Sequence, residues 1–304
     1  MKRIILSIFL FVLFASSAFP TDGSNINGFW TSVNIGNHQY RSVFFVNQNT
    51  GWIVGWGGTV LKTTNRGITW GIQNASGDFQ SVYFINQNTG WIVGNSPIYK
   101  TTNGGINWVA KSGTGNILLI VKFLDAINGY ICGYGGAVLK TTNGGNNWVS
   151  KSTGVSYNLT GLDFVDKNNG WISGDNGTVK KTTDCGDTWI TQNSGTTANI
   201  GKLDFVDYNN GWITADNGNI LRTTNGGNKW ILTQTPVTDW LSTVYFLDAY
   251  VGYAAGGIYY GGECDILKTI NGGVTWYKIP VPANKWVALL YFVNPKIGWA
   301  VCND

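Results

Sequence analysis

Two aspartates are the residues in this sequence whose types and spacing best suit acid–base chemistry. Asp163 and Asp204 occupy equivalent positions in two repeated segments, 41 residues apart. A facing pair of carboxylates is the minimum equipment of most glycoside hydrolases. The other interpretation is that both are solvated carboxylates lining a channel. The sequence does not fix their separation, so a glycoside hydrolase stays as the alternative function.

Other catalytic and metal centres lack the residues that they need. A sialidase-type site requires an arginine cluster and a glutamate partner. Glu263 is the only glutamate, and the arginines after the N-terminal segment stand at unrelated positions: Arg41, Arg66 and Arg222. The only histidine, His38, excludes multi-histidine metal sites and repeated histidine-based triads. We therefore predict no metal site and no cofactor.

A nine-residue motif of the form KTTNGGINW recurs six times and is typical of an Asp-box turn, with Asn usually replacing Asp. The Asn or Asp side chain can accept hydrogen bonds from amides of its own turn, the glycine supplies a positive φ, and the tryptophan fills the space under the turn. With one such side chain per repeat, turn stabilisation is favoured over metal binding. The polar members are Asn65, Asn103, Asn143, Asp184, Asn225 and Asn271, and the tryptophans are Trp70, Trp108, Trp148, Trp189, Trp230 and Trp276.

These boxes belong to a repeat of about 40 residues. A Gly-aromatic pair marks each of seven units, and a phenylalanine precedes every pair by six or seven residues. The pairs begin at Gly51, Gly90, Gly129, Gly170, Gly211, Gly252 and Gly298. Apolar residues alternate with variable ones ahead of each phenylalanine, as strands do. Each unit therefore predicts four short strands, and seven such units predict an all-β, seven-bladed propeller.

The two ends of the chain predict how the ring closes. Residues 29–33 resemble the fourth strand of a unit, whereas the C-terminal unit stops after its second strand. We expect the N-terminal strand to complete the last blade. No segment at either end supplies the third strand of that blade, so we expect the C-terminus to be incomplete at Asp304. A three-stranded last blade is the alternative.

The N-terminus has the pattern of a signal peptide. Lys2 and Arg3 precede the apolar run Ile4 to Phe14, and small residues follow up to Ala18. We predict cleavage near Ala18, a single propeller domain over residues 19–304, and a secreted or periplasmic protein. No other stretch is apolar enough to span a membrane. We expect a monomer.

The charge of the chain argues against a nucleic-acid partner. The formal net charge is +4, of which Lys2 and Arg3 contribute two, so the remaining chain carries about +2. Binding to phosphate backbones requires clustered lysines and arginines rather than a small scattered excess.

The run GWIVGWGGTVLKTTNRGITW and its relatives resemble the photosystem II assembly factor family of propellers. More distantly, the repeats resemble sialidase-type, sortilin-type and xyloglucanase-type Asp-box propellers. The resemblance covers nearly all of residues 29–304. It implies a propeller fold and, from the photosynthetic members, binding to a membrane-protein assembly intermediate through a positively charged surface. The same repeats occur in proteins of unrelated function, so the fold is the firmer implication.

Non-repeated aromatic residues predict a binding surface on the face opposite the Asp-box turns. They fall in loops that join second to third strands or fourth to next first strands, together with a few cations. The predicted binding residues are Trp240, Tyr259, Tyr260, Trp286, Lys285, His38 and Arg41; Trp56 and Tyr134 lie in loops of the same kind. Large aromatics beside cations suit a protein or glycan partner. We therefore predict a non-catalytic binding scaffold.

One disulfide is also predicted. Cys264 and Cys302 fall in neighbouring units and at the same face of the expected ring. Cys185 lies in a box turn on the opposite face, and Cys132 lies inside a strand three blades away.

Overall fold

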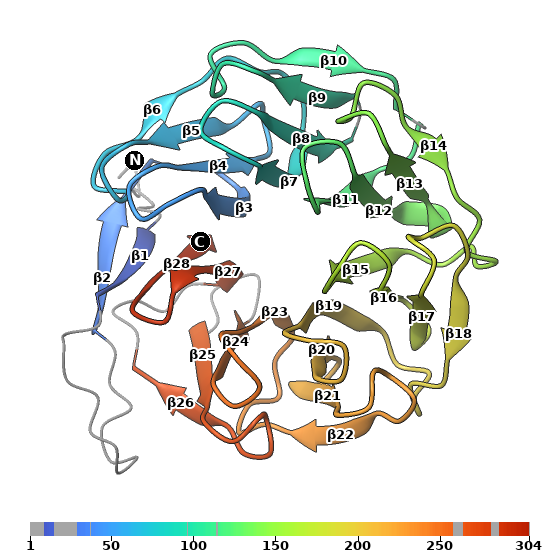
Figure 1. Ribbon diagram of the computed structural model, residues 1–304. Helices are drawn as coiled ribbons and strands as arrows, with labels where there is room; N and C mark the ends of the chain where they lie inside the picture. Colours follow the sequence, from blue (N-terminus) through green and yellow to red (C-terminus); the bar gives the residue numbers. More distant parts are fainter. Residues whose placement is uncertain are drawn as a thin grey trace, which may run out of the picture.

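A ring of β-sheets is the whole of the described architecture. The computed structural model describes residues 9–14, 29–36, 38–95, 97–113, 115–257, 264–280 and 286–303. These residues form seven four-stranded sheets arranged around a central channel (Figure 1). The predicted all-β propeller of four-stranded blades is confirmed. Within the described residues no helix is both long and apolar enough to cross a membrane.

Each repeat contributes its strands from the channel outward. The innermost strands are β3 (Tyr40–Phe45), β7 (Phe79–Phe84), β11 (Leu118–Phe123), β15 (Leu159–Phe164), β19 (Ile200–Phe205), β23 (Leu241–Phe246) and β27 (Trp286–Asn294). The second strands are β4 (Gly51–Gly55), β8 (Gly90–Gly94), β12 (Gly129–Gly133), β16 (Gly170–Gly174), β20 (Gly211–Ala215), β24 (Gly252–Gly257) and β28 (Ile297–Asn303). The third strands are β5 (Val60–Thr63), β9 (Ile98–Thr101), β13 (Val138–Thr141), β17 (Thr178–Thr182), β21 (Asn219–Thr223) and β25 (Cys264–Thr269). The outer strands are β6 (Gly71–Ile72), β10 (Val109–Lys111), β14 (Val149–Ser150), β18 (Ile190–Gln192), β22 (Ile231–Gln234) and β26 (Tyr277–Ile279), and a short 3-10 turn, η1 (Tyr134–Gly136), follows β12.

Six blades, not seven, follow the predicted plan of four consecutive strands. Blades one to six run from β3–β6 to β23–β26 in chain order. The last repeat supplies only β27 and β28, and its sheet is completed from the N-terminus in the order β2-β1-β28-β27. This antiparallel sheet, called the closing sheet below, is built from N-terminal and C-terminal strands of the chain (Figure 1).

The closing sheet corrects the expectation that neither end supplies its third strand. β1 (Phe9–Phe14) lies between β28 and β2 (Phe29–Asn34), with Val12 opposite both Trp299 and Thr31. This segment belongs to the apolar run that predicts a signal peptide. A short run of aromatic and branched residues suits a central strand of a sheet as well as the core of a leader, which is why the pattern alone did not reveal this pairing.

The Gly-aromatic pairs and the phenylalanines form the contacts between blades. Each pair's aromatic ring stacks on the phenylalanine of the next blade; Trp52 lies 3.5 Å from Phe84 between ring centroids, and Trp212 lies 3.4 Å from Phe246. The glycine of the pair leaves room for its own blade's phenylalanine, because a Cβ on Gly51 would meet the Phe45 ring at 2.5 Å. The predicted blade-to-blade packing of these aromatics is confirmed.

Each innermost strand is irregular near its start, where the channel opens. The pairing register between first and second strands shifts at the second or third residue of the innermost strand, for example between Tyr40 and Ser42. In blade five the shift is wider, from Ile200 to Leu203, so Gly201 and Lys202 have no partner in the ladder. Bulges of this kind redirect side chains. Here the redirected positions line the mouth of the channel.

Candidate functional site at the channel mouth

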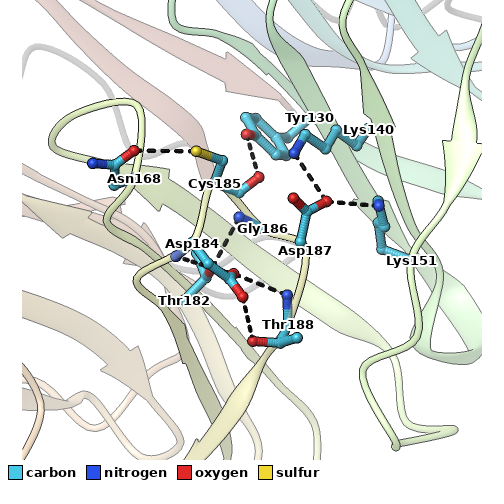
Figure 2. Close-up of polar contacts among 10 residues, drawn as sticks. All are labelled: Tyr130, Lys140, Lys151, Asn168, Thr182, Asp184, Cys185, Gly186, Asp187 and Thr188. Atoms are coloured by element: carbon cyan, nitrogen blue, oxygen red, sulfur yellow. Dashed lines mark hydrogen bonds and ion pairs between the residues drawn. The ribbon is translucent and has the colours of Figure 1, made fainter.

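The Asp-box turns fold as predicted, and the turn of blade four shows why (Figure 2). Asp184 accepts a hydrogen bond from the Thr188 amide at 2.9 Å and another from the Thr188 hydroxyl at 2.6 Å. These hydrogen bonds lower the pKa of Asp184 to about 2. The Thr182 hydroxyl accepts from the Gly186 amide at 2.9 Å. Gly186 and the preceding Cys185 both have positive φ, at 73° and 61°. The side chain of the polar box residue therefore forms its hydrogen bonds within its own turn.

The same turn is also held by the preceding blade. Asp187 forms ion pairs with Lys140 at 3.0 Å and Lys151 at 2.7 Å, and both lysines lower its pKa (Figure 2). Tyr130 donates from its hydroxyl to the Cys185 carbonyl at 2.6 Å. The box turn is therefore a contact between blades as well as a turn within one.

This forward contact, called the latch below, recurs around the ring. Four indole nitrogens of the Gly-aromatic pairs donate to a carbonyl in the box turn of the next blade, as Trp52 does to Gly104 at 3.1 Å and Trp212 to Gly272 at 2.9 Å. The indole nitrogen of Trp91 is an exception, with no hydrogen-bond partner among the described residues. The lysine of the third strand adds to it, since Lys62 donates to the same Gly104 carbonyl at 2.9 Å. The box turns therefore have a structural role, and they lie at the ends of the blades opposite the channel mouth.

Asp163 and Asp204 are not the solvated channel-lining carboxylates that one interpretation of the sequence predicted. Asp163 is 3% exposed, forms an ion pair with Lys122, and accepts from the Phe205 amide of the next blade at 2.7 Å. Asp204 accepts from the Phe246 amide of its own next blade at 2.5 Å. Burial and the neighbouring Asp163 charge raise the pKa of Asp204 to about 7. Both carboxylates therefore join adjacent blades along the channel wall.

Two adjoining cavities occupy the part of the channel toward the starts of the innermost strands. The deep cavity has a volume of about 190 Å³ and contains Lys122, Asp163 and Asp204 with three tyrosines, Tyr83, Tyr245 and Tyr291. Burial opposes the charge of Lys122, but the adjacent Asp163 carboxylate more than offsets this and raises the pKa of Lys122. Lys122 and Asp163 therefore neutralise each other within this cavity, and Asp163 is held by that ion pair and by the Phe205 amide instead of standing free as a catalytic acid or base.

The mouth cavity, of about 180 Å³, opens at the starts of the innermost strands. Its described lining contains two indoles and two cations: Trp240, Trp286, Arg41 and Lys202. The Arg41 guanidinium lies 4.0 Å from the Trp56 ring centroid and 5.5 Å from that of Trp286. Polar contributions come from Gln80, Thr160 and Ser242, and no carboxylate is among the described lining residues. The mouth is thus aromatic, polar and positively charged.

The structure brings three of the predicted binding residues together and separates one. Arg41, Trp240 and Trp286 all line the mouth cavity. His38 is exposed ahead of β3, with its ring 5.9 Å from that of Tyr40, and is not part of the described lining. Tyr259, Tyr260 and Lys285 lie outside the described residues.

Lys202 is the functional candidate that the sequence analysis missed. Its equivalents in the other repeats are Ser42, Ser81, Ile120, Gly161, Thr243 and Leu289, so it alone brings a charge to this row. The row two residues further along holds Asp163 and Asp204. The row of Lys202 contains a single lysine among small and apolar residues, and this is the signal by which the sequence could have indicated it.

The predicted disulfide stays a prediction. Cys302 is buried in β28, whereas the side chain of Cys264 lies outside the described part of the chain. Burial raises the pKa of Cys132, which lies inside β12, to about 12.

Comparison with known proteins identifies the repeat. The sequence profile described as photosynthesis system II assembly factor YCF48 matches residues 24–112, 110–193 and 152–230. No curated protein sequence matches the chain.

Solved structures show the same fold at low sequence identity. A YCF48 protein bound to a D1 peptide superposes with a TM-score of 0.70 at 20% identity, covering 88% of this chain and 93% of that one. YCF48 from Cyanidioschyzon merolae gives a TM-score of 0.69 at 21% identity, covering 87% and 95%. An ancestral GH74 enzyme is also similar, with a TM-score of 0.66 at 13% identity, but the match covers 87% of this chain and only 44% of the enzyme.

Proposed function

Because this chain belongs to the photosynthesis system II assembly factor YCF48 family, we propose that it is a non-catalytic scaffold that binds a partner protein. A YCF48 protein of the same fold is bound to a D1 peptide, so a peptide ligand has a precedent on this propeller. We place the ligand at the channel mouth, on the face opposite the Asp-box turns. The partner is an extended segment of another protein.

One observation carries this proposal: two indoles and two cations from separate parts of the chain converge at one opening. Trp240 precedes β23, Trp286 begins β27, Arg41 belongs to β3 and Lys202 to β19. Tryptophan and arginine are the residue types that dominate binding energy at protein interfaces. A neutral glycan could stack on the indoles, whereas a peptide with acidic groups could contact the indoles and the cations together, so the protein partner is favoured.

The hydrolase alternative has no comparable support. Asp163 and Asp204 each bind the backbone of a neighbouring blade, and Asp163 is further held by Lys122. A hydrolytic pair needs one proton donor and one free carboxylate on opposite sides of a glycosidic bond. The likeness to the GH74 enzyme, at 13% identity, speaks for the fold alone.

The seven-bladed ring and export of the protein are also part of the proposal. We propose that the closing sheet acts as the seventh blade and that residues 1–18 direct the chain out of the cytoplasm. Both proposals concern β1, because cleavage near Ala18 would remove Phe9–Phe14 from its place between β28 and β2. The intact mass of the exported protein tests this: loss of residues 1–18 supports the signal peptide, and retention of Met1 or Lys2 contradicts it.

Peptide display tests the binding function directly. Selection of random twelve-residue peptides on the purified protein should yield ligands of micromolar affinity. The variant Arg41→Ala/Trp240→Ala/Trp286→Ala should weaken them at least thirtyfold, the effect of about 2 kcal/mol that a hot spot carries. The matched control, Ile72→Ser/Tyr277→Ser, replaces exposed residues of outer strands and should leave affinity unchanged. Failure to select any peptide, or equal weakening by both variants, would contradict the proposal.

A further inference from the structure

Lys202 stands at the boundary between the deep cavity and the mouth cavity and lines both. It follows Gly201 in the irregular part of β19, where the ladder to β20 is interrupted. Its side chain is only partly exposed. The backbone irregularity therefore holds a lysine ammonium inside the channel, at the inner end of an opening flanked by Trp240 and Trp286.

The charge of Lys202 has no counterpart in the described part of the chain. Its ammonium forms neither an ion pair nor a hydrogen bond there, and desolvation lowers its pKa to about 8. The residue beside the interruption, Thr214, is fully buried, and its hydroxyl also has no hydrogen-bond partner among the described residues. A buried polar or charged group is costly unless something pairs with it.

The nearby carboxylates are already committed elsewhere. Asp163 is held by Lys122 and by the Phe205 amide, and Asp204 accepts from the Phe246 amide. The described lining of the mouth itself contains no acid, and it adds a second cation, Arg41. Lys202 therefore contributes a positive charge that the described lining of the mouth does not neutralise.

We infer that the mouth cavity binds an organic carboxylate, with the carboxylate on Lys202 and the apolar part of the ligand against Trp240 and Trp286. A volume of about 180 Å³ fits a group the size of one aromatic ring with its acid. A free small acid and a carboxylate of a bound peptide present the same chemistry. This inference therefore does not depend on the proposed function. If the carboxylate belongs to a bound peptide, the inference also identifies how the proposed peptide ligand is held.

The pH dependence of this site follows from the groups around Lys202. The described titratable or charged groups that line its two cavities or lie behind it are Arg41, Tyr83, Lys122, Cys132, Asp163, Asp204, Tyr245 and Tyr291. Burial raises the pKa values of the tyrosines and of Cys132. Of these groups Asp204, with a pKa of about 7, titrates below Lys202. Loss of carboxylate binding above pH 8 therefore reports on Lys202.

Fluorine NMR with 4-fluorobenzoate and its neutral isostere 4-fluorobenzamide tests the inference on the full chain. We expect 4-fluorobenzoate to bind with a Kd of about 1 mM, as suits a ligand of ten heavy atoms, and the amide to bind at least tenfold more weakly. Lys202→Met should weaken the acid at least tenfold, whereas Lys229→Met, an exposed lysine in the box turn of blade five, should not. Above pH 8 the wild-type affinity for the acid should fall about tenfold per pH unit, because binding then requires uptake of a proton.

Several outcomes would overturn the inference. These are equal binding of acid and amide, full binding by Lys202→Met, and an affinity that does not change between pH 7 and 10. The last measurement needs no variant and holds even if Lys202→Met fails to fold. Competition between 4-fluorobenzoate and a selected peptide identifies the peptide as a source, and amidation of its C-terminus separates a terminal carboxylate from a side-chain one. Carboxylate binding without competition identifies a free acid and leaves the proposed function to its own test.

Discussion

A single position in the repeat binds the next blade in two chemically different ways. Asp163 and Asp204 accept from backbone amides of the following blade. Tyr245 and Tyr291 instead donate to carbonyls, of Phe292 and Phe45, both at 2.8 Å. At four of its seven occurrences, this variable position therefore joins adjacent blades by hydrogen bonds to the backbone, through side chains of different chemistry. The variability of the side chains indicated that this position lines the channel, but it could not indicate that these side chains form hydrogen bonds to the next blade.

Asp204 makes this residue-scale account testable by pH. Its pKa rises from 3.8 to about 7 in the folded protein, so the folded state binds the proton more tightly than the unfolded state does. Stability from this group is present below about pH 4 and is lost as pH rises to about 7. Asp204→Asn keeps an acceptor for the Phe246 amide and removes the charge. We expect it to raise the free energy of unfolding above pH 7 by about 1–2 kcal/mol, and to have less effect at pH 4.

Urea denaturation of the wild type and Asp204→Asn at pH 4, 6 and 8 measures this difference. Asp239→Asn, in the loop before β23, is the control and should show no such dependence. A variant that is less stable than the wild type at pH 8 would show that the carboxylate charge, and not only its acceptor oxygen, is needed.

At the scale of elements, the box turn and the Gly-aromatic pair are two halves of one contact. The pair's aromatic stacks on the next phenylalanine and donates to the next box turn, as Trp212 does with Phe246 and Gly272. Tyr130 occupies the same position as Trp212 and donates through its hydroxyl to Cys185 in the box turn of the next blade. A tyrosine at this position can therefore make the latch as well.

The latch predicts the order in which substitutions at Trp212 reduce the free energy of unfolding. Trp212→Phe keeps a ring on Phe246 but loses the hydrogen bond to Gly272, and should cost about 1 kcal/mol more than Trp212→Tyr. Trp212→Ala also removes the stacked ring from the core and should cost about 3–5 kcal/mol. The midpoints of chemical denaturation of the three variants measure this order of stability. Equal losses for Phe and Tyr would show that stacking alone holds the blades.

Most of the blade could be predicted from the sequence, because local chemistry determines it. Periodic Gly-Trp pairs and boxes fix strand number and turn type, and the boxes adopt the expected positive φ at residues such as Gly186. The channel mouth was predicted only through its aromatics. The sequence shows Lys202 as the one charged residue in its row, but it does not show that this row faces the channel, because the shift in β19 changes which side chains do so and leaves no mark in the alternation of apolar residues.

At the scale of the whole molecule, ring closure depends on contacts between residues far apart in the chain. Asn303 at the end of β28 accepts from the Tyr40 amide at 2.8 Å and donates to the Tyr40 carbonyl at 2.7 Å. The Trp299 ring stacks on Phe45 with 3.5 Å between ring centroids, and its indole nitrogen donates to the Arg66 carbonyl at 3.1 Å. The closing sheet thus meets blade one through the same latch as other blades, with an amide side chain added.

Removal of that side chain should weaken the entire ring. Asn303→Ala leaves the buried amide and carbonyl of Tyr40 unpaired, which should cost about 2–4 kcal/mol in the free energy of unfolding. Hydrogen exchange at the Tyr40 amide should accelerate with it. Asn294→Ala, which affects an exposed turn, is the control. Unchanged exchange at Tyr40 in Asn303→Ala would mean that the closing sheet is held by its aromatic contacts alone.

Where the latch forms, its forward direction gives the boundary between two blades two unlike sides. One side donates through Trp or Tyr and Lys, and the other receives through the box turn and the phenylalanine. The boundary is therefore heterologous, like the head-to-tail joints of a ring-shaped oligomer. A ring broken at any boundary exposes one donor end and one acceptor end, which cannot pair about a two-fold axis. Opened copies would join end to end into filaments instead of symmetric dimers.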